Sequence, residues 1–167
     1  NLKEFDCSFN NISQLDVTNN TELIDFFFID NNISTIDVTQ NTKLVQLGAG
    51  KNLLGQLDVT QNILLENLGC YENQLTALDV SNNNKLQRLS CYVNQISSLD
   101  LSNKPDLIHL WVFVNDLDEL DLSQKPNLER LSCGVNNIES LDLSQNPLLT
   151  QVECKSNSLT YLNVKNG

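Results

Sequence analysis

The sequence predicts a mainly β solenoid, in which the chain winds through stacked coils of 21 residues. Three observations predict this fold class. A Leu recurs every 21 residues, an Asn follows eight positions after each Leu, and the residues between them alternate between apolar and variable. An unbroken period in this range is typical of repeat proteins whose coils pack only on their neighbours. Eight coils follow one another without insertion or deletion, starting at Leu2, Leu23, Leu44, Leu65, Leu86, Leu107, Leu128 and Leu149.

We number the columns of each coil 1 to 21 from its first Leu. Columns 4 and 6 are apolar, as in Leu89 and Cys91, whereas columns 3, 5 and 7 vary freely. This alternation predicts a short strand with one buried face. Stacked coils would then form a parallel sheet that grows by about 4.8 Å per coil, so that residues 21 apart become neighbours.

The second half of each coil predicts a return side of short strands or turns. Its apolar columns 11, 14 and 16 repeat the spacing of columns 1, 4 and 6, and no segment there carries a helical apolar period over three turns. We therefore expect little or no α-helix. A return side this compact also favours a flatter solenoid than one backed by helices.

Column 9 is Asn in every coil. At the turn that follows a strand, backbone N–H and C=O groups lose their sheet partners and need others. An Asn side chain offers both donors and an acceptor at such a turn. The eight residues are Asn10, Asn31, Asn52, Asn73, Asn94, Asn115, Asn136 and Asn157.

The frame LxxLxLxxNxL, with Cys at the third apolar position and LD[VL][ST] further on, resembles the leucine-rich-repeat pattern over the whole chain. It is most similar to the short 21-residue repeats of bacterial surface and secreted proteins, including the internalins. The resemblance implies a buried Asn ladder, a ligand face on the parallel sheet, and an extracellular or cell-surface location. We expect residues 1–167 to form a single leucine-rich-repeat domain that is a fragment of a longer chain.

Composition restricts the partners. The net charge of −11 and the isoelectric point near 4.3 argue against nucleic acid, because phosphate binding needs a basic surface. No run of eighteen apolar residues occurs, which argues against membrane insertion.

All cysteines fall at column 6, where other coils carry Phe, Ala or Val. A column shared by these residues is an interior one, so the thiols are interpreted as small hydrophobic groups. Their spacing favours neither a redox motif nor a metal site. The cysteines are Cys7, Cys70, Cys91, Cys133 and Cys154.

Column 15 is Asp in seven coils and lies between inward-facing columns, so its carboxylates are expected to point outward. We expect them to accept hydrogen bonds from the Ser or Thr at column 17 or from nearby amides. A row of bound calcium ions is the alternative, although a single file of carboxylates supplies few ligands per ion. The seven residues are Asp16, Asp37, Asp58, Asp79, Asp100, Asp121 and Asp142.

Candidate ligand residues stand in the columns that the fold leaves free. Tyr71, Tyr92 and Phe113 occupy column 7 of consecutive coils and form an aromatic row. Trp111, at column 5, has only serines as column neighbours, which predicts open ring faces. Glycines on both sides of the row, at positions 50 and 134, predict aromatic rings that stand out from the sheet. A smaller apolar group, made of Ile24, Phe27 and Ile29, is interpreted as a contact with further repeats or a cap.

Column 3 places Arg88, His109 and Arg130 beside these aromatics. Aromatic and Arg residues are enriched at binding hot spots. The alternative is a row of stacked side chains that only stabilises its sheet. The candidate ligand residues are Tyr71, Arg88, Tyr92, His109, Trp111, Phe113 and Arg130.

These patterns predict a non-catalytic binding module for protein recognition or adhesion, and a homo-oligomer through the same patch is also possible. The alternative is an anionic polysaccharide, with sugars on the aromatic rings and acid groups on Arg88 and Arg130. We do not expect an enzyme, because the one histidine has no nucleophile or orienting carboxylate in its frame and no Gly-rich phosphate loop occurs. No cofactor and no metal ion is expected.

Overall fold

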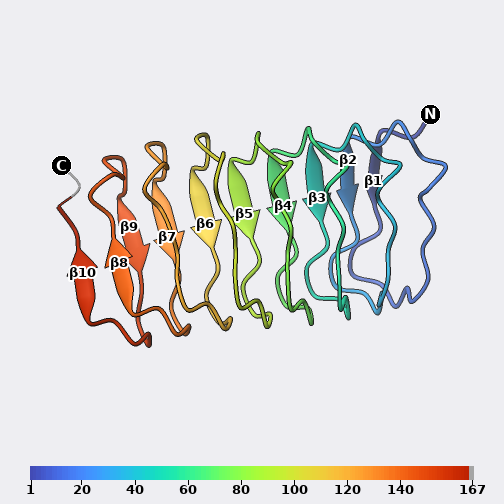
Figure 1. Ribbon diagram of the computed structural model, residues 1–167. Coiled ribbons are helices and arrows are strands. Elements are labelled where there is room, and N and C mark those ends of the chain that lie inside the picture. The colour runs from blue at the N-terminus through green and yellow to red at the C-terminus, as the bar shows by residue number, and fades with distance from the viewer. Residues whose placement is uncertain (166–167) are drawn as a thin grey trace.

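The computed structural model describes residues 1–165 as a nearly straight stack of coils (Figure 1). Within these residues no helix occurs, which confirms the predicted mainly β solenoid. One sheet contains the first seven strands and β9, all parallel and paired in coil order. Its members are β1 (Glu4–Asp6), β2 (Asp25–Phe27), β3 (Gln46–Gly48), β4 (Asn67–Gly69), β5 (Arg88–Ser90), β6 (His109–Trp111), β7 (Arg130–Ser132) and β9 (Gln151–Glu153).

Every strand pair of this sheet has the predicted register of 21 residues. Leu89 of β5 lies opposite Leu110 of β6, which in turn lies opposite Leu131 of β7. Because strand residues alternate between two faces, the central residue of β2 to β7 is buried while its two neighbours face away from the core. At the two ends of the sheet, Phe5 of β1 is half-buried and Val152 of β9 is exposed. The strands are three residues long, since the chain bends inward soon after column 5.

The return side is extended, as predicted, but it is paired as a ladder only at the C-terminal end of the described chain. There β8 (Ser140–Asp142) pairs in parallel with β10 (Tyr161–Asn163). Each coil is then closed by a short turn, in which the column 1 amide donates to the carbonyl three residues earlier, as from Leu65 to Asn62.

The core runs along the stack as a row of leucines flanked by the column 6 side chains. Cys70, Cys91 and Cys133 are buried, Cys7 and Cys154 are half-buried, and all five are free thiols. Burial raises the pKa of the Cys91 thiol to about 12. The buried thiols therefore pack as neutral apolar groups, and the predicted interior position of column 6 is confirmed.

The column 9 asparagines form the ladder that the resemblance implied. Asn94 is typical: its Nδ2 donates to the carbonyl oxygens of Cys91 in its own coil and Cys70 in the preceding coil, at 3.0 and 3.1 Å. Its Oδ1 accepts from the amide of Leu75, also in the preceding coil, at 3.0 Å. One side chain thus satisfies the turn backbone of two successive coils.

The residue before each of these asparagines adopts a left-handed backbone conformation, with φ between 50° and 57°. Such a conformation costs a non-glycine residue roughly 1–3 kcal/mol, and Val93, Val114 and Val135 adopt it although they are β-branched. The backbone stays hydrogen-bonded through this turn, for example from the Val93 amide to the Phe113 carbonyl. These contacts hold the strained turn at the same place in every coil.

The column 15 carboxylates form a second repeated turn. Asp79 Oδ1 accepts from the amide of Ser81 at 2.9 Å, and Asp100 Oδ1 does so from Ser102 at 2.8 Å. These bonds lower the pKa of both carboxyls below its ordinary value. The predicted hydrogen bonding to column 17 is confirmed, and it explains why outward-facing acids recur in this column.

Removing one ladder amide should destabilise the solenoid strongly. We expect Asn94→Ala to lower the free energy of unfolding by about 2–4 kcal/mol, because it leaves buried backbone groups of two coils without partners. Urea unfolding followed by circular dichroism measures this loss. The matched control is Asn84→Ala at an exposed position, where we expect a change within about 0.5 kcal/mol. Equal losses in the two variants would contradict the assigned role of the ladder.

Candidate functional site

The coils bring all seven candidate residues onto one face of the sheet, along β4 (Asn67–Gly69) to β7 and the segments that follow these strands. At its centre, Tyr71, Tyr92 and Phe113 form a stack, which we call the aromatic ladder. The ring centroids of Tyr71 and Tyr92 are 4.7 Å apart, and those of Tyr92 and Phe113 are 4.3 Å apart. The rings lie within 10° of parallel, so each pair stacks face to face.

The ladder rings do not stand out from the sheet as the flanking glycines predicted. All three are half-buried, and the Tyr71 ring covers Gly50 so closely that a Cβ at Gly50 would lie 2.5 Å from Tyr71 Cζ. Phe27 and Ile29 cover Gly48 in the same way. The prediction was wrong because a glycine leaves a hollow that the neighbouring side chain fills, which removes apolar surface from water.

Trp111 lies beside the ladder and is also half-buried. The imidazole of His109 tilts against it, with the ring centroids 5.1 Å apart and the planes at 56°. The expectation of two open indole faces is therefore corrected, because the residue two positions earlier on the same strand covers part of the ring.

Arg88, His109 and Arg130 form a row on adjacent strands, which we call the basic row. Arg88 Nε donates to His109 Nδ1 at 3.3 Å, and Arg88 Nη1 donates to Asn67 Oδ1 at 3.2 Å. These contacts orient the guanidinium over the strands. Both arginines are exposed, whereas the His109 side chain is only 14% exposed.

The imidazole of His109 is the neutral member of the row. Burial, followed by the charges of Arg88 and Arg130, lowers its pKa below the ordinary value. A neutral ring agrees with Nδ1 acting as an acceptor. On the other side, Nε2 lies 3.9 Å from Glu129 Oε2, so a carboxylate is present that the column frame did not predict. Glu129 escaped prediction because it belongs to column 2, whereas the candidate residues were taken from columns 3, 5 and 7.

The left-handed turns add an apolar border to the aromatic ladder. Val93, Val114 and Val135 are 37–42% exposed and follow directly after the ladder column. We call the aromatic ladder, Trp111, the basic row and these valines together the sheet-face patch. It combines aromatic, cationic and aliphatic groups on one surface, and aromatic and Arg residues are enriched at binding hot spots.

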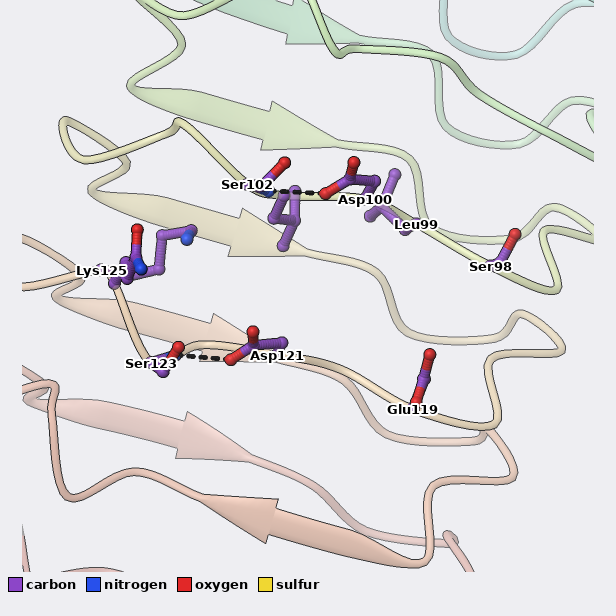
Figure 2. Close-up of a pocket in the computed structure, with 10 residues that line it drawn as sticks. Ser98, Leu99, Asp100, Ser102, Glu119, Asp121, Ser123 and Lys125 are labelled. Atoms are coloured by element: carbon purple, nitrogen blue, oxygen red, sulfur yellow. Dashed lines mark hydrogen bonds between the residues drawn. The ribbon is translucent and has the colours of Figure 1, made fainter.

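Apart from the sheet-face patch, the return side of the coils contains a hollow of about 460 Å³ (Figure 2). Asp100 and Asp121 line it, and each carboxylate is hydrogen-bonded to the amide of the serine two residues later. Glu119 stands further along the hollow, beside Ser98. Across residues 1–165, no group of three or more His, Cys, Asp or Glu side chains is arranged to hold a metal ion.

The same two coils contain two buried lysines that the sequence patterns did not predict, and Lys125 is one of the residues that line the hollow. Lys104 is completely buried and Lys125 is 2% exposed, at the column where most coils have Asn. Lys104 Nζ donates to the Ser102 carbonyl at 3.0 Å, as Asn83 Nδ2 donates to backbone carbonyls one coil earlier. The signal in the sequence was the recurrence of Asn in this column in five of the eight coils, which marks it as a column that the fold restricts.

No protein-family model and no curated protein sequence matches the chain. Among solved structures, the functional domain of InlJ from Listeria monocytogenes, which includes a cysteine ladder, has a TM-score of 0.83 and 34% identity. It covers 99% of this chain, and the match spans 42% of that structure. A leucine-rich-repeat protein of Leptospira interrogans has a TM-score of 0.88 and 26% identity, covering 96% of this chain and 45% of the other.

The internalin InlF of Listeria monocytogenes shares the fold, with a TM-score of 0.70 and 21% identity over 93% of this chain and 54% of the other. The chain is a leucine-rich-repeat protein, and its short coils are similar to those of the bacterial members of this class. It spans less than half the length of the first two structures. This class of protein fits a protein-binding repeat module. Within the described residues, no helix is long and apolar enough to cross a membrane.

The buried lysines should make stability depend on pH. Burial lowers the pKa of both amines below 10.5, so near these pKa values the unfolded chain binds more protons and stability rises with pH up to about 10.5. We therefore expect wild type to gain unfolding free energy relative to Lys104→Asn/Lys125→Asn as the pH increases through this window. Cysteine ionisation is common to both proteins and cancels in the difference.

Chemical unfolding at a series of pH values measures this difference. The control variant is Asn84→Ala, which changes an exposed residue without a titratable group, so its difference from wild type should stay constant with pH. If the unfolding free energy of wild type relative to Lys104→Asn/Lys125→Asn stayed constant or fell as the pH rose, the two amines would not have a lowered pKa.

Proposed function

We propose that this leucine-rich-repeat protein is a non-catalytic binding module that recognises a protein partner through the sheet-face patch. The single observation that carries the proposal is the convergence of seven aromatic and basic or histidine side chains on one face of four consecutive coils. The partner would place an acidic and apolar surface here, since Arg88 and Arg130 are exposed cations on a chain whose net charge is −11. Adhesion at a bacterial surface is the setting that the resemblance favours.

The geometry favours a protein over an anionic polysaccharide. A sugar ring binds to an aromatic side chain by stacking on its face, but both faces of Tyr92 are occupied by Tyr71 and Phe113. Tyr71 has Gly50 against it, and Trp111 is partly covered by His109. Apart from the outer face of Phe113, the ladder therefore presents ring edges. Ring edges between cations and valines match the apolar centre and polar rim of a protein interface.

The polysaccharide candidate retains one supporting observation. Arg88 and Arg130 stand two coils apart, about 9.6 Å at the strand spacing of a parallel sheet, and are exposed with His109 between them. Two guanidinium groups at a fixed spacing suit the acid groups of a regular polymer. The third candidate is a homo-oligomer formed through the patch. Measuring the mass of the purified chain in solution tests for this oligomer.

A parallel screen separates these candidates. The purified chain is tested against a panel of extracellular proteins and against an array of uronate-containing and sulfated glycans. We expect protein ligands, and we expect Arg88→Ala/Trp111→Ala to weaken their binding at least about 30-fold, as for the loss of a hot-spot residue worth about 2 kcal/mol. Circular dichroism confirms that the variant is folded.

The matched control is Asp118→Ala/Glu119→Ala, which changes exposed residues of the return side and should leave affinity unchanged. Binding that survives the Arg88 and Trp111 substitutions would contradict the assignment of the patch. Ligands found only among the glycans would replace the protein proposal by the polysaccharide one.

A further inference from the structure

The aromatic ladder has one open end. Tyr92 is stacked on both faces, and the outer side of Tyr71 is closed by Gly50, whose Cβ position would lie within 2.7 Å of three ring atoms. Phe113 is stacked on one side only, because the next residue of its column is Gly134. Phe113 is therefore the ladder ring with a face available to a ligand.

This face borders a groove of about 280 Å³. The floor of the groove is Gly134 and Ser132, both buried. Lys155 forms the wall opposite Phe113, and Glu153 lies at the rim. Val114 and Val135 line the remaining side, so the groove is apolar along its length and charged at one end.

The spacing of the coils suits a planar guest. Phe113 and Lys155 are two coils apart, which is about 9.6 Å at the usual spacing of parallel strands. One ring inserted midway would continue the 4.3–4.7 Å stack by one further rung. The chain cannot easily supply this ring itself, because a Cβ at Gly134 would lie 3.0 Å from the Lys155 carbonyl oxygen. The Lys155 stem leans over the glycine, but this side chain is exposed and long enough to turn aside.

The walls select the chemistry of the guest. Phe113 offers a ring face for stacking, and the Lys155 ammonium offers a cation for the opposite face. The Glu153 carboxylate is already held by Ser132 Oγ at 3.4 Å and by Gln151 Nε2 at 3.2 Å, and it can accept a further hydrogen bond. An aromatic ring with a donor at its tip meets all three groups, and an aliphatic side chain meets none of them.

We propose that the groove between Phe113 and Lys155 binds a tyrosine or tryptophan side chain of the partner protein, which becomes the fourth rung of the aromatic ladder. This inference rests on the proposed function and names the residue type that anchors the partner. The hydroxyl or indole N–H of the inserted side chain donates to Glu153, and the side chain's stem runs along Val114 and Val135.

The test is a titration of the isotope-labelled chain, followed by the backbone amide signals, with N-acetyl-tryptophanamide as the probe. N-acetyl-leucinamide is the matched aliphatic probe, and methyl β-galactopyranoside is the sugar probe. We expect saturable shifts centred on Gly134, Val135 and Lys155, with binding about tenfold tighter than that of the leucine amide. Lys155→Ala should weaken it about threefold, by loss of the cation.

Phe113→Leu keeps an apolar wall and should remove the preference for the aromatic probe, whereas Lys51→Ala, at an exposed residue away from the groove, should change nothing. Shifts scattered over the surface, equal binding of the leucine amide, or preference for the sugar would each overturn the proposal. These outcomes are distinct from failure of the proposed function, because they leave the effect of Arg88→Ala/Trp111→Ala on whole ligands intact. If Arg88→Ala/Trp111→Ala did not weaken partner binding while the groove still bound the probe, only the assignment of the wider sheet-face patch would be wrong.

Discussion

The asparagine ladder is the interaction on which the rest of the structure depends. Each coil has to leave the sheet, turn inward and return, and the turn leaves backbone groups without sheet partners. One amide bonds carbonyls of its own coil and the preceding coil and accepts an N–H from the latter, as Asn115 does with Val112, Cys91 and Ile96. Because the side chain joins two coils, it works only if successive coils have equal length. An inserted residue would move the next asparagine away from its partners and reverse the faces of the strand.

Equal coil length turns every column into a straight row of side chains, and rows have physical consequences that single positions do not. Carboxylates about 4.8 Å apart would repel one another, so each column 15 Asp is held instead by a nearby amide. Aromatic residues at the same spacing stack and use up each other's faces. A row of stacked rings therefore has an open ring face only at an end, and this end is where Phe113 meets the groove above Gly134.

The buried lysines show how far the frame tolerates exceptions. Lys104 and Lys125 occupy an interior column and carry amines that burial disfavours in the charged state. Asp100 lies near enough to both to favour their charge in part. Lys104 also donates to backbone carbonyls and so takes over a task that an asparagine performs in other coils. At this position the fold therefore accepts a lysine ammonium as donor in place of an asparagine amide.

The sequence by itself determined the solenoid, its register and its interior, because each depends on a contact that recurs at a fixed spacing from coil to coil. It also placed Tyr71, Arg88, Tyr92, His109, Trp111, Phe113 and Arg130 on one face, since column identity decides the face of a strand. Only the tertiary structure decided how these side chains lie. Tyr71 folds over Gly50, His109 tilts against Trp111, and Glu129 approaches His109 from outside the row. These side-chain conformations follow from rotation and local packing in the exposed columns. No contact repeated along a column restricts them, because the neighbours that each side chain contacts belong to other columns.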